Sequence, residues 1–363
     1  MTRIDDLPTP ALLLDLDRLE TNIEHMAAKC RALGVSLRPH VKTHKCIEVA
    51  DRQRAAGATG ITVSTLAEAH VFAGRGYDDI TWAFPFILNR VAEAGRLARD
   101  ITLRVTIDSE AAFEAIEDST HPFHVWIKID CGYHRAGLDP STPAPLALAR
   151  RIRESATLAF DGFLTHGGHA YHAASLDAIR HIAEDERRAV ADLRAQCAGR
   201  GADVGASVGS TPTLSVVEHL DGVTEARPGN YAFYDGQQAA LGACQMTACA
   251  LSLLASAVSS PGRGHSVIDA GALALSKDAG PSPAGPAMGR VFADYAAGTL
   301  RDDAVLTSLS QEHGIVSAAL TVGERVRLLP NHACLAAACF DEYHVVRGDQ
   351  VVDRWPIHRR REA

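Results

Sequence analysis

The order of short apolar runs and longer helical segments constrains the fold of this chain most strongly. Eight short runs, rich in β-branched or other apolar residues, occupy the first two-thirds of the sequence at residues 36–41, 60–64, 79–84, 102–107, 124–130, 160–166, 203–209 and 222–226. Segments rich in Ala, Leu, Arg and Glu at helical spacing lie between them, for example at 16–33, 65–75, 145–154 and 176–198. Because eight strands that alternate with helices can close on themselves, the pattern predicts an α/β fold with a (β/α)8 TIM-type barrel.

The pattern changes after about residue 242. Strand-like runs separated by turns follow at 247–258, 265–269, 324–329, 335–346 and 350–355, and residues 280–289 are a Gly-, Pro- and Ala-rich stretch typical of a loop. We therefore expect two domains, a barrel over residues 1–240 and a mostly β C-terminal domain over residues 241–363.

Charge and composition argue against several partners. The net charge is −8, and no basic stretch precedes the three arginines at 359–361, so nucleic acid is not an expected partner. The most apolar stretch, residues 248–258, is about half the length that crosses a bilayer. The first ten residues lack the apolar core of a signal peptide, which predicts a cytoplasmic location. Eight scattered cysteines without a CxxC pair do not indicate a disulfide framework.

Unusual polar residues gather where the predicted barrel strands end, which is the face where such barrels bind ligands. The first strand runs into RPHVKTHK, which contains Lys42, and a partly shielded lysine near other cations can have its pKa lowered enough to form a Schiff base. Arg135 follows the fifth strand, and the sixth ends in THGGHAYH, with His166 and Tyr171. Alone, a lysine such as Lys42 is more often a surface charge, and Arg135 is as likely to form a structural ion pair. Three His and a Tyr among small residues are hard to explain as packing, and together these strand ends indicate a site.

The loops after the last two predicted strands contain glycines and small hydroxyl residues. Ser210 and Thr211 follow the seventh strand, and Gly229, Asn230 and Tyr231 follow the eighth. Backbone N–H groups in such loops form the usual phosphate site of this fold, although ordinary turns have the same composition. Combined with a lysine at a strand end, they predict a phosphorylated carbonyl cofactor.

A metal-like pair, His332 and Cys334, lies in the sequence PNHAC. If this segment is a strand, residues two apart share a face, so an imidazole and a thiolate can converge on one ion. That ligand pair suits zinc and leaves coordination positions open for substrate or water. The nearby Gln311 and His313 belong either to an active-site loop or to a polar turn.

These motifs, taken together, closely resemble those of the D-serine dehydratase and D-threonine aldolase family, whose members share the alanine racemase-like fold, called fold type III among pyridoxal-phosphate (PLP) enzymes. The resemblance rests on RPHVKTHK, GYHRAG, THGGHAY, VGSTPT, RPGNYAFYD, QEHG and PNHAC, which follow one another in the family's order, and it runs from about residue 7 to residue 355.

The resemblance implies a role for each candidate residue. Lys42 would be the Schiff-base lysine, Arg135 would face the pyridine nitrogen, His166 would lie against the cofactor ring, and Tyr171 would border the substrate. The phosphate would be held by Ser210, Thr211, Gly229, Asn230 and Tyr231. The metal would be bound by His332 and Cys334. Family members are usually homodimers, so we expect a homodimer.

The metal motif favours one reaction within the family. The metal motif of the group's aldolases resembles His-Cys-Asp, which suits manganese or magnesium. The motif of this chain, His-Ala-Cys, resembles that of the zinc-dependent dehydratases. We therefore predict a PLP- and zinc-dependent dehydratase that converts a β-hydroxy D-amino acid, such as D-serine or D-threo-3-hydroxyaspartate, into a 2-oxo acid and ammonia. Lys42 would remove the α-proton, and zinc would assist loss of the β-hydroxyl.

Three alternatives remain open at this point. They are a metal-dependent D-threonine or 3-hydroxy-D-aspartate aldolase that uses Mn²⁺ or Mg²⁺ and gives glycine and an aldehyde, an amino-acid racemase, and a non-catalytic PLP-binding protein. The sequence also leaves open which D-amino acid is used and what Gln311, His313, His169 and His172 do.

Overall fold

The computed structural model describes residues 2–199, 203–283 and 285–358. They form two compact units, which we call the barrel unit (Met26–Lys42 and Val49–Gly229) and the β unit (Met1–His25, Thr43–Glu48 and Asn230–Arg359). Neither unit is continuous in sequence, and the domain boundary expected between residues 240 and 241 stays a prediction. The terminal arginine run at 359–361 lies outside the described residues.

The barrel unit is built on eight parallel strands, which confirms the predicted fold class. They are β2 (Ser36–Leu37), β3 (Ile61–Val63), β4 (Asp79–Pro85), β5 (Thr102–Ile107), β6 (His124–Lys128), β7 (Ala159–Leu164), β8 (Gly205–Val208) and β9 (Glu225–Ala226). The sheet runs in the order β2-β9-β8-β7-β6-β5-β4-β3, and a parallel bridge between His40 and Thr62 joins its two ends. Every strand expected from the sequence of this region is present.

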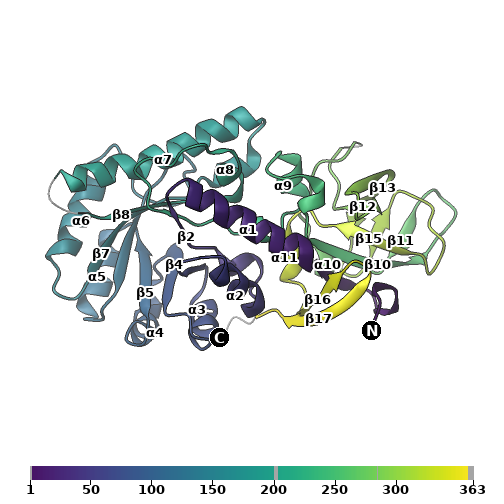
Figure 1. The fold of residues 1–363 in the computed structure, drawn as a ribbon, viewed down its shortest axis with the longest axis horizontal. Helices are drawn as coiled ribbons and strands as arrows, with labels where there is room; N and C mark the ends of the chain where they lie inside the picture. Colours follow the sequence, from purple (N-terminus) through teal and green to yellow (C-terminus); the bar gives the residue numbers. More distant parts are fainter. Residues whose placement is uncertain (1, 200–202, 284, 359–363) are drawn as a thin grey trace. The chain divides into compact units, whose positions relative to one another are not determined.

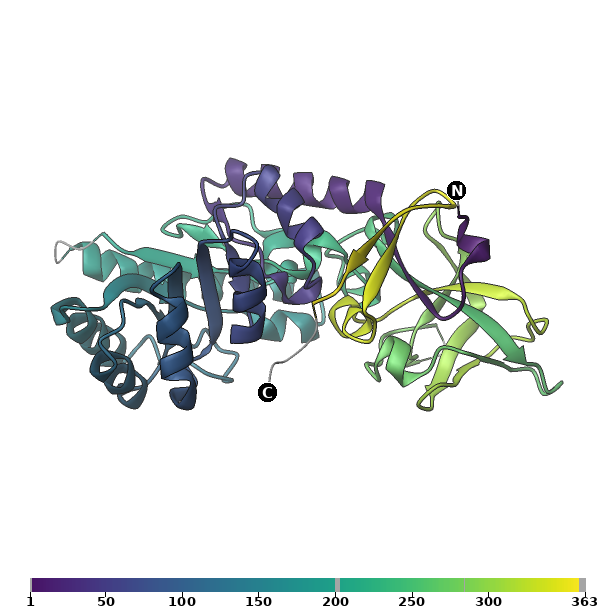
Figure 2. The same ribbon diagram turned by 90° about the horizontal axis from the view of Figure 1, so that it is seen from below.

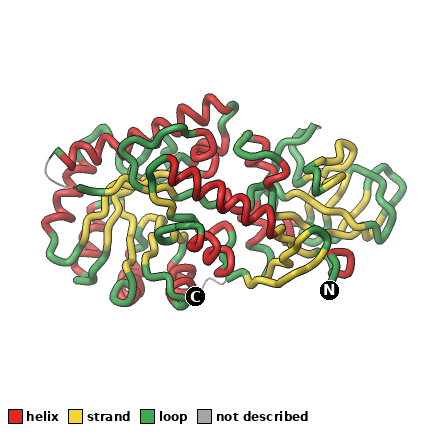
Figure 3. Tube along the Cα trace, in the orientation of Figure 1, coloured by secondary structure: helices red, strands yellow, loops and turns green. Residues whose placement is uncertain are grey.

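Helices alternate with these strands and lie outside the sheet (Figures 1 and 3). The longer ones are α1 (Leu16–Ala32), α2 (Ile47–Ala55), α3 (Leu66–Ala73), α4 (Val91–Leu97), α5 (Glu110–Asp118), α6 (Ala144–Glu154), α7 (Leu176–Ala198) and α8 (Thr211–Val216). Hydroxyl side chains begin several of them: Thr65, Ser109 and Ser175 each accept a hydrogen bond from the backbone N–H three residues later.

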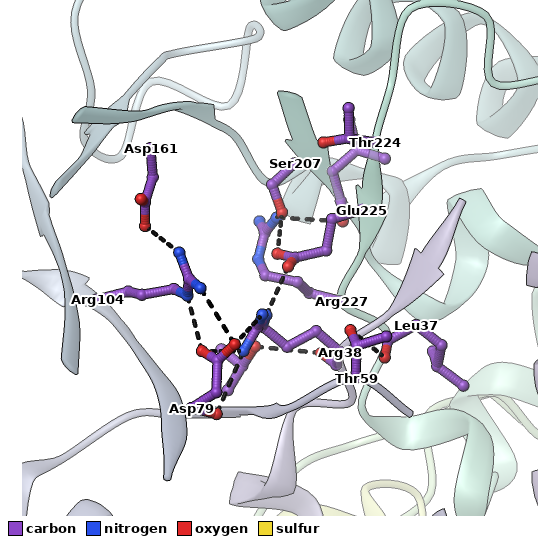
Figure 4. A network of polar contacts seen from close by, with 12 residues as sticks. Leu37, Arg38, Thr59, Asp79, Arg104, Asp161, Ser207, Thr224, Glu225 and Arg227 are labelled. Carbon is purple, nitrogen blue, oxygen red and sulfur yellow. Dashed lines mark hydrogen bonds and ion pairs between the residues drawn. The ribbon is translucent and has the colours of Figure 1, made fainter. Parts of the chain in front are cut away.

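An ion network inside the barrel ties its strands together (Figure 4). Arg38, directly after β2, lies between Asp79 on β4, whose carboxylate it contacts at 2.7 and 3.0 Å, and Glu225 on β9, at 2.5 Å. Arg104 on β5 likewise lies between Asp79, at 2.7 and 3.1 Å, and Asp161 on β7. Because each guanidinium contacts two carboxylates, the charges of this network are paired, as buried charges need to be.

The described residues of the β unit form a nine-stranded sheet and few helices. Figures 1 and 2 show its strands. The strands are β1 (Ala11–Asp15), β10 (Leu251–Ser259), β11 (Ser266–Ile268), β12 (Arg290–Asp294), β13 (Thr299–Leu309), β14 (Gly314–Val316), β15 (Arg325–Leu329), β16 (Glu342–Arg347) and β17 (Gln350–Pro356). Their order is β11-β14-β13-β12-β15-β10-β1-β16-β17, and β11 also pairs with β10. The six strands from β10 to β15 therefore form a closed ring, and β1, β16 and β17 extend the sheet.

Strand β1 was not expected from the sequence. All five of its residues are buried, and it pairs antiparallel with β10 and parallel with β16, so it is a central strand of the β unit. An apolar run buried on both faces is typical of such a position.

The expected strand at 335–346 is partly wrong. The structure has a short helix, α11 (Ala333–Ala337), before β16, since the Ala-rich sequence there favours a helical turn. Two further short helices of the unit are α9 (Gly236–Ala240) and α10 (Ala272–Leu275). Among the described residues, no helix combines the length and the apolar character required to span a membrane. The cytoplasmic location stays a prediction.

Candidate active site

Lys42 lies in a 3₁₀ turn (Val41–Thr43) that follows β2 after a short connection, at the carboxyl end of the barrel strands. The residue is exposed. The charge of Lys42 acts on two imidazoles of the barrel unit, His40 and His166, and after burial it is the strongest influence that lowers their pKa. The predicted lysine and His166 therefore lie at the same end of the barrel.

His166 follows β7 and is neutral in this environment. Burial and the charges of Lys42 and Lys128 hold its pKa well below the usual range. Its Nδ1 lies 2.7 Å from the carbonyl oxygen of Gly209, so Nδ1–H donates there and Nε2 carries no proton. Gly209 has a φ of +142°, and an added Cβ would lie 2.6 Å from the backbone nitrogen of Arg227, so only glycine fits there.

Two further cations at this end of the barrel were not anticipated from the sequence. Lys128, the last residue of β6, is 7% exposed, and burial together with the charge of Arg227 lowers its pKa to about 7. Arg227 directly follows β9, is 5% exposed, and donates to the carbonyl oxygens of Thr165 and Val208. Burial lowers its pKa to about 10, against the opposing charges of Glu225 and Glu186. Lys128 belongs to no motif of the sequence, and Arg227 begins the RPGNYAFYD motif but was not singled out as a site residue.

Arg135 belongs to an aromatic cluster after β6. Its guanidinium lies 4.7 Å from the centroid of the Tyr133 ring, which stacks on His169 at 5.8 Å and meets His166 edge-on at 6.3 Å. The charge of Arg135 also lowers the pKa of Lys128 and of His166. The structure thus gives His169 a packing role against Tyr133. Tyr171 is half-buried in the 3₁₀ turn Gly168–His172, whereas His172 is exposed.

Glu186, on α7, fixes the two loops that follow β7 and β8. This carboxylate is 1% exposed and accepts hydrogen bonds from the backbone N–H groups of Gly167 (2.6 Å) and Gly209 (3.0 Å) and from the Thr213 hydroxyl (2.8 Å). The predicted phosphate residues Ser210 and Thr211 lie directly after Gly209 and are buried. The Ser210 hydroxyl caps α8 by accepting from the N–H of Thr213. Glu186 therefore positions the predicted phosphate loop from behind.

The remaining predicted phosphate residues continue the chain after Arg227. Gly229 is buried in the barrel unit, and Asn230 and Tyr231 are buried in the β unit. The Asn230 amide nitrogen donates to Asp235 at 2.6 Å, so this side chain is engaged within the β unit. The structure brings Lys42, His166 and Arg135 to one end of the barrel and places Ser210 and Thr211 beside the Gly209 carbonyl that His166 contacts.

His332 and Cys334 contact each other in the β unit, but not across a strand face. His332 precedes α11 in an extended conformation and Cys334 lies in the first turn of that helix, so the strand geometry assumed from the sequence is wrong. Burial alone would lower the pKa of His332, but its hydrogen bonds with Cys334 and Asp278 and the charges of Cys334 and Asp235 raise it to about 10.

The thiol has two further polar neighbours within the β unit. The Cys334 sulfur lies 3.3 Å from the Thr43 hydroxyl and 3.9 Å from the Asn230 amide nitrogen. Within the part of the chain that the structure describes, no group of three or more His, Cys, Asp or Glu side chains could hold a metal. Gln311 and His313 are exposed in the turn between β13 and β14.

Comparison with known proteins agrees with this arrangement. Residues 14–236 match the family model of the alanine racemase N-terminal domain, and residues 250–346 match the putative serine dehydratase domain. The chain is 39% identical to the D-threo-3-hydroxyaspartate dehydratase of Delftia sp. (strain HT23), over 96% of this chain and 97% of that protein. The chain belongs to the D-serine dehydratase and D-threonine aldolase family.

Other family members are also similar over almost the whole chain. The D-serine dehydratase of Dictyostelium discoideum is 32% identical, over 96% of each chain. The solved structure of a cysteine-to-alanine mutant of D-threo-3-hydroxyaspartate dehydratase, in its metal-free form, superposes with a TM-score of 0.92 at 37% identity, and covers 98% of this chain and 99% of that one. The predicted family is confirmed, and the chain is an enzyme of the PLP-dependent lyase class.

Proposed function

We propose that this enzyme is a zinc-dependent dehydratase that converts a β-hydroxy D-amino acid, of the size of D-serine or D-threo-3-hydroxyaspartate, into a 2-oxo acid and ammonia. One observation carries the proposal: an exposed lysine, Lys42, and the imidazole of His166 both follow barrel strands at their carboxyl ends, where the buried cations Lys128 and Arg227 also lie.

The charges at the barrel mouth fit PLP. Lys128 and Arg227 are buried there, and burial lowers the pKa of each, so an anion would stabilise their charged forms. A phosphorylated cofactor and an amino-acid carboxylate both supply negative charge. Ser210 and Thr211, held in place by Glu186 through Gly209 and Thr213, would hold the phosphate. Gly229, Asn230 and Tyr231 would complete that loop.

The protein side chains then have distinct tasks. PLP supplies an aldehyde that combines with amines and a ring that withdraws electrons from the carbon beside the amine. Lys42 would hold the cofactor and, once its amine is free, accept the α-proton at Nζ. His166 would lie against the ring with its unprotonated Nε2, and Arg135 would keep the pyridine nitrogen unprotonated. Tyr171 would border the substrate.

The donor set of the β unit fits zinc. His332 offers a nitrogen and Cys334 a sulfur, which are ligands that zinc binds readily, and both come from residues already in contact. A zinc ion supplies Lewis acidity for loss of a hydroxyl group. The thiolate favours zinc over manganese or magnesium, and this supports a dehydratase over an aldolase.

The activity is tested by product analysis. Purified protein is incubated with D-serine, D-threonine or D-threo-3-hydroxyaspartate, with and without a chelator. A 2-oxo acid with ammonia, lost on chelation, is the expected result. Glycine with an aldehyde would show an aldolase, an inverted amino acid a racemase, and absence of turnover a non-catalytic binding protein; each of these would overturn the proposal.

The lysine assignment is tested separately. Lys42→Ala should abolish the visible absorbance that PLP shows when bound to a lysine amine, and Lys45→Gln, at the neighbouring lysine, should keep it. Absorbance retained by Lys42→Ala would refute the assignment. Family members also lead us to propose a homodimer, which analytical ultracentrifugation of the purified protein would test.

A further inference from the structure

A carboxylate lies directly behind the proposed metal ligand His332. The Nδ1 atom of its imidazole is 2.7 Å from Oδ2 of Asp278, a residue 54 positions earlier in the chain. The two side chains are partly exposed, at 30% for His332 and 46% for Asp278. Because a carboxylate only accepts, Nδ1–H donates, and the lone pair of a neutral imidazole is then on Nε2.

The backbone around Asp278 is held by the residue next to His332. The Asn331 amide nitrogen donates to the carbonyl oxygens of Asp278 (2.8 Å) and Ala287 (2.7 Å). Gly280 and Ala287 exchange backbone hydrogen bonds at 2.8 and 2.9 Å, which close the base of the loop. A Cβ at Gly280 would lie 2.4 Å from the Asn331 side-chain oxygen, so the glycine permits this close approach. These contacts therefore fix the backbone at the start of the Gly- and Pro-rich loop, which carries Asp278 next to His332.

The other carboxylate near this site cannot take the same role in this structure. Both oxygens of Asp235 are engaged: Oδ1 accepts from the Gln238 backbone, and Oδ2 accepts from the Asn230 amide and the Ala333 backbone N–H. Asp235 is fully buried and fixes the start of α11. Its charge reaches His332, but the carboxylate hydrogen-bonded to the imidazole is that of Asp278.

From this geometry we infer that Asp278 is a positioning residue for the metal site: its carboxylate fixes the tautomer and ring orientation of His332 so that Nε2 is available to the metal, and its charge makes that nitrogen a stronger donor. Metal-binding histidines commonly donate their second N–H to a carboxylate, and loss of this partner typically weakens metal affinity by about 10- to 100-fold. The inference deepens the proposed function, because it rests on His332 as a ligand.

The test measures metal affinity in the PLP-loaded protein, independently of turnover. Co²⁺ is titrated into metal-depleted protein, with detection of the thiolate-to-cobalt absorbance, and Zn²⁺ is measured by competition with a chromophoric chelator. Asp278→Ala should weaken the affinity for both metals by about 10- to 100-fold. Asp278→Asn, whose side-chain oxygen can still accept from Nδ1–H, should recover part of the loss. The PLP absorbance should not change in either variant.

A matched control separates a local effect from a general loss of negative charge. Asp302, whose side chain is 91% exposed in the same unit, lies 3.8 Å from Arg290, and Asp302→Ala should bind both metals as the wild type does. Wild-type affinity in Asp278→Ala would overturn the inference. If instead the wild type binds neither metal, or His332→Ala and Cys334→Ala bind as the wild type does, the proposed metal site itself fails.

Discussion

Replacement of Glu186 should show how strongly the loops at the barrel mouth depend on one helix residue. In Glu186→Ala, the buried N–H groups of Gly167 and Gly209 lose their acceptor, whereas the Thr213 hydroxyl keeps the Ser210 carbonyl oxygen at 3.2 Å. Each buried N–H without a partner costs about 1–3 kcal/mol. Two such groups predict that the free energy of unfolding falls by roughly 2–6 kcal/mol.

The isosteric variant should be much milder. In Glu186→Gln, the side-chain oxygen can still accept from the two N–H groups, and the Thr213 hydroxyl can turn to accept from the new amide. The loss of the negative charge should lower the free energy of unfolding by about 1–2 kcal/mol. The difference of roughly 2 kcal/mol between the two variants measures the unsatisfied N–H groups rather than the charge.

The assay is urea unfolding of the cofactor-free protein, followed by circular dichroism, with PLP affinity measured on the same samples. Glu184 on the same helix is the control, because its carboxylate is 39% exposed and pairs with Arg187, so Glu184→Ala should change stability by less than about 1 kcal/mol. PLP should bind more weakly to Glu186→Ala, since Gly209 and the loop after it lose their support. A loss below about 1 kcal/mol in Glu186→Ala, or equal losses in both variants, would refute the reasoning.

Two other perturbations test the barrel interior. Asp79→Ala removes a carboxylate shared by Arg38 and Arg104, which keep Glu225 and Asp161 as partners. The free energy of unfolding, measured in urea, should fall by about 3 kcal/mol. A decrease no larger than that in Asp302→Ala would count against the network. Lys128 has a pKa lowered to about 7, so in the cofactor-free protein the unfolded state binds the extra proton between about pH 7 and pH 10, and stability from this group falls as the pH falls toward 7. The free energy of unfolding of Lys128→Met should therefore rise relative to that of the wild type by up to about 4 kcal/mol as the pH is lowered from 10 to 7. Parallel pH profiles of the two proteins would contradict this.

The barrel was predictable because its signals are local. Each parallel strand is a short apolar run followed by a helix, and β2 to β9 all lie where such runs occur. The strand-end residues Lys42, Arg135 and His166 were also recognisable, since their loops concentrate polar side chains that packing does not require. Their roles toward the cofactor remain predictions, as do those of the phosphate and metal residues.

The features missed from the sequence depend on distant partners. Lys128 and Arg227 become significant only when ring closure buries them together, and Glu186 lies mid-helix among many acidic residues. Asp278 meets His332 across 54 positions. The expected strand at His332 and Cys334 failed because a two-residue spacing does not distinguish a strand from the start of a short helix.

The position of β1 has a consequence for synthesis on the ribosome. Its partners β10 and β16 begin at Leu251 and Glu342, so this buried apolar segment leaves the exit tunnel long before either neighbour exists. The barrel sequence is translated in the interval and can fold first, since its contacts are more local. Until the last strands emerge, the nascent N-terminus exposes an apolar segment, ALLLD, to which chaperones can bind. Ribosome stalling before residue 342 should therefore leave the β unit immature, with its first strand still accessible to protease.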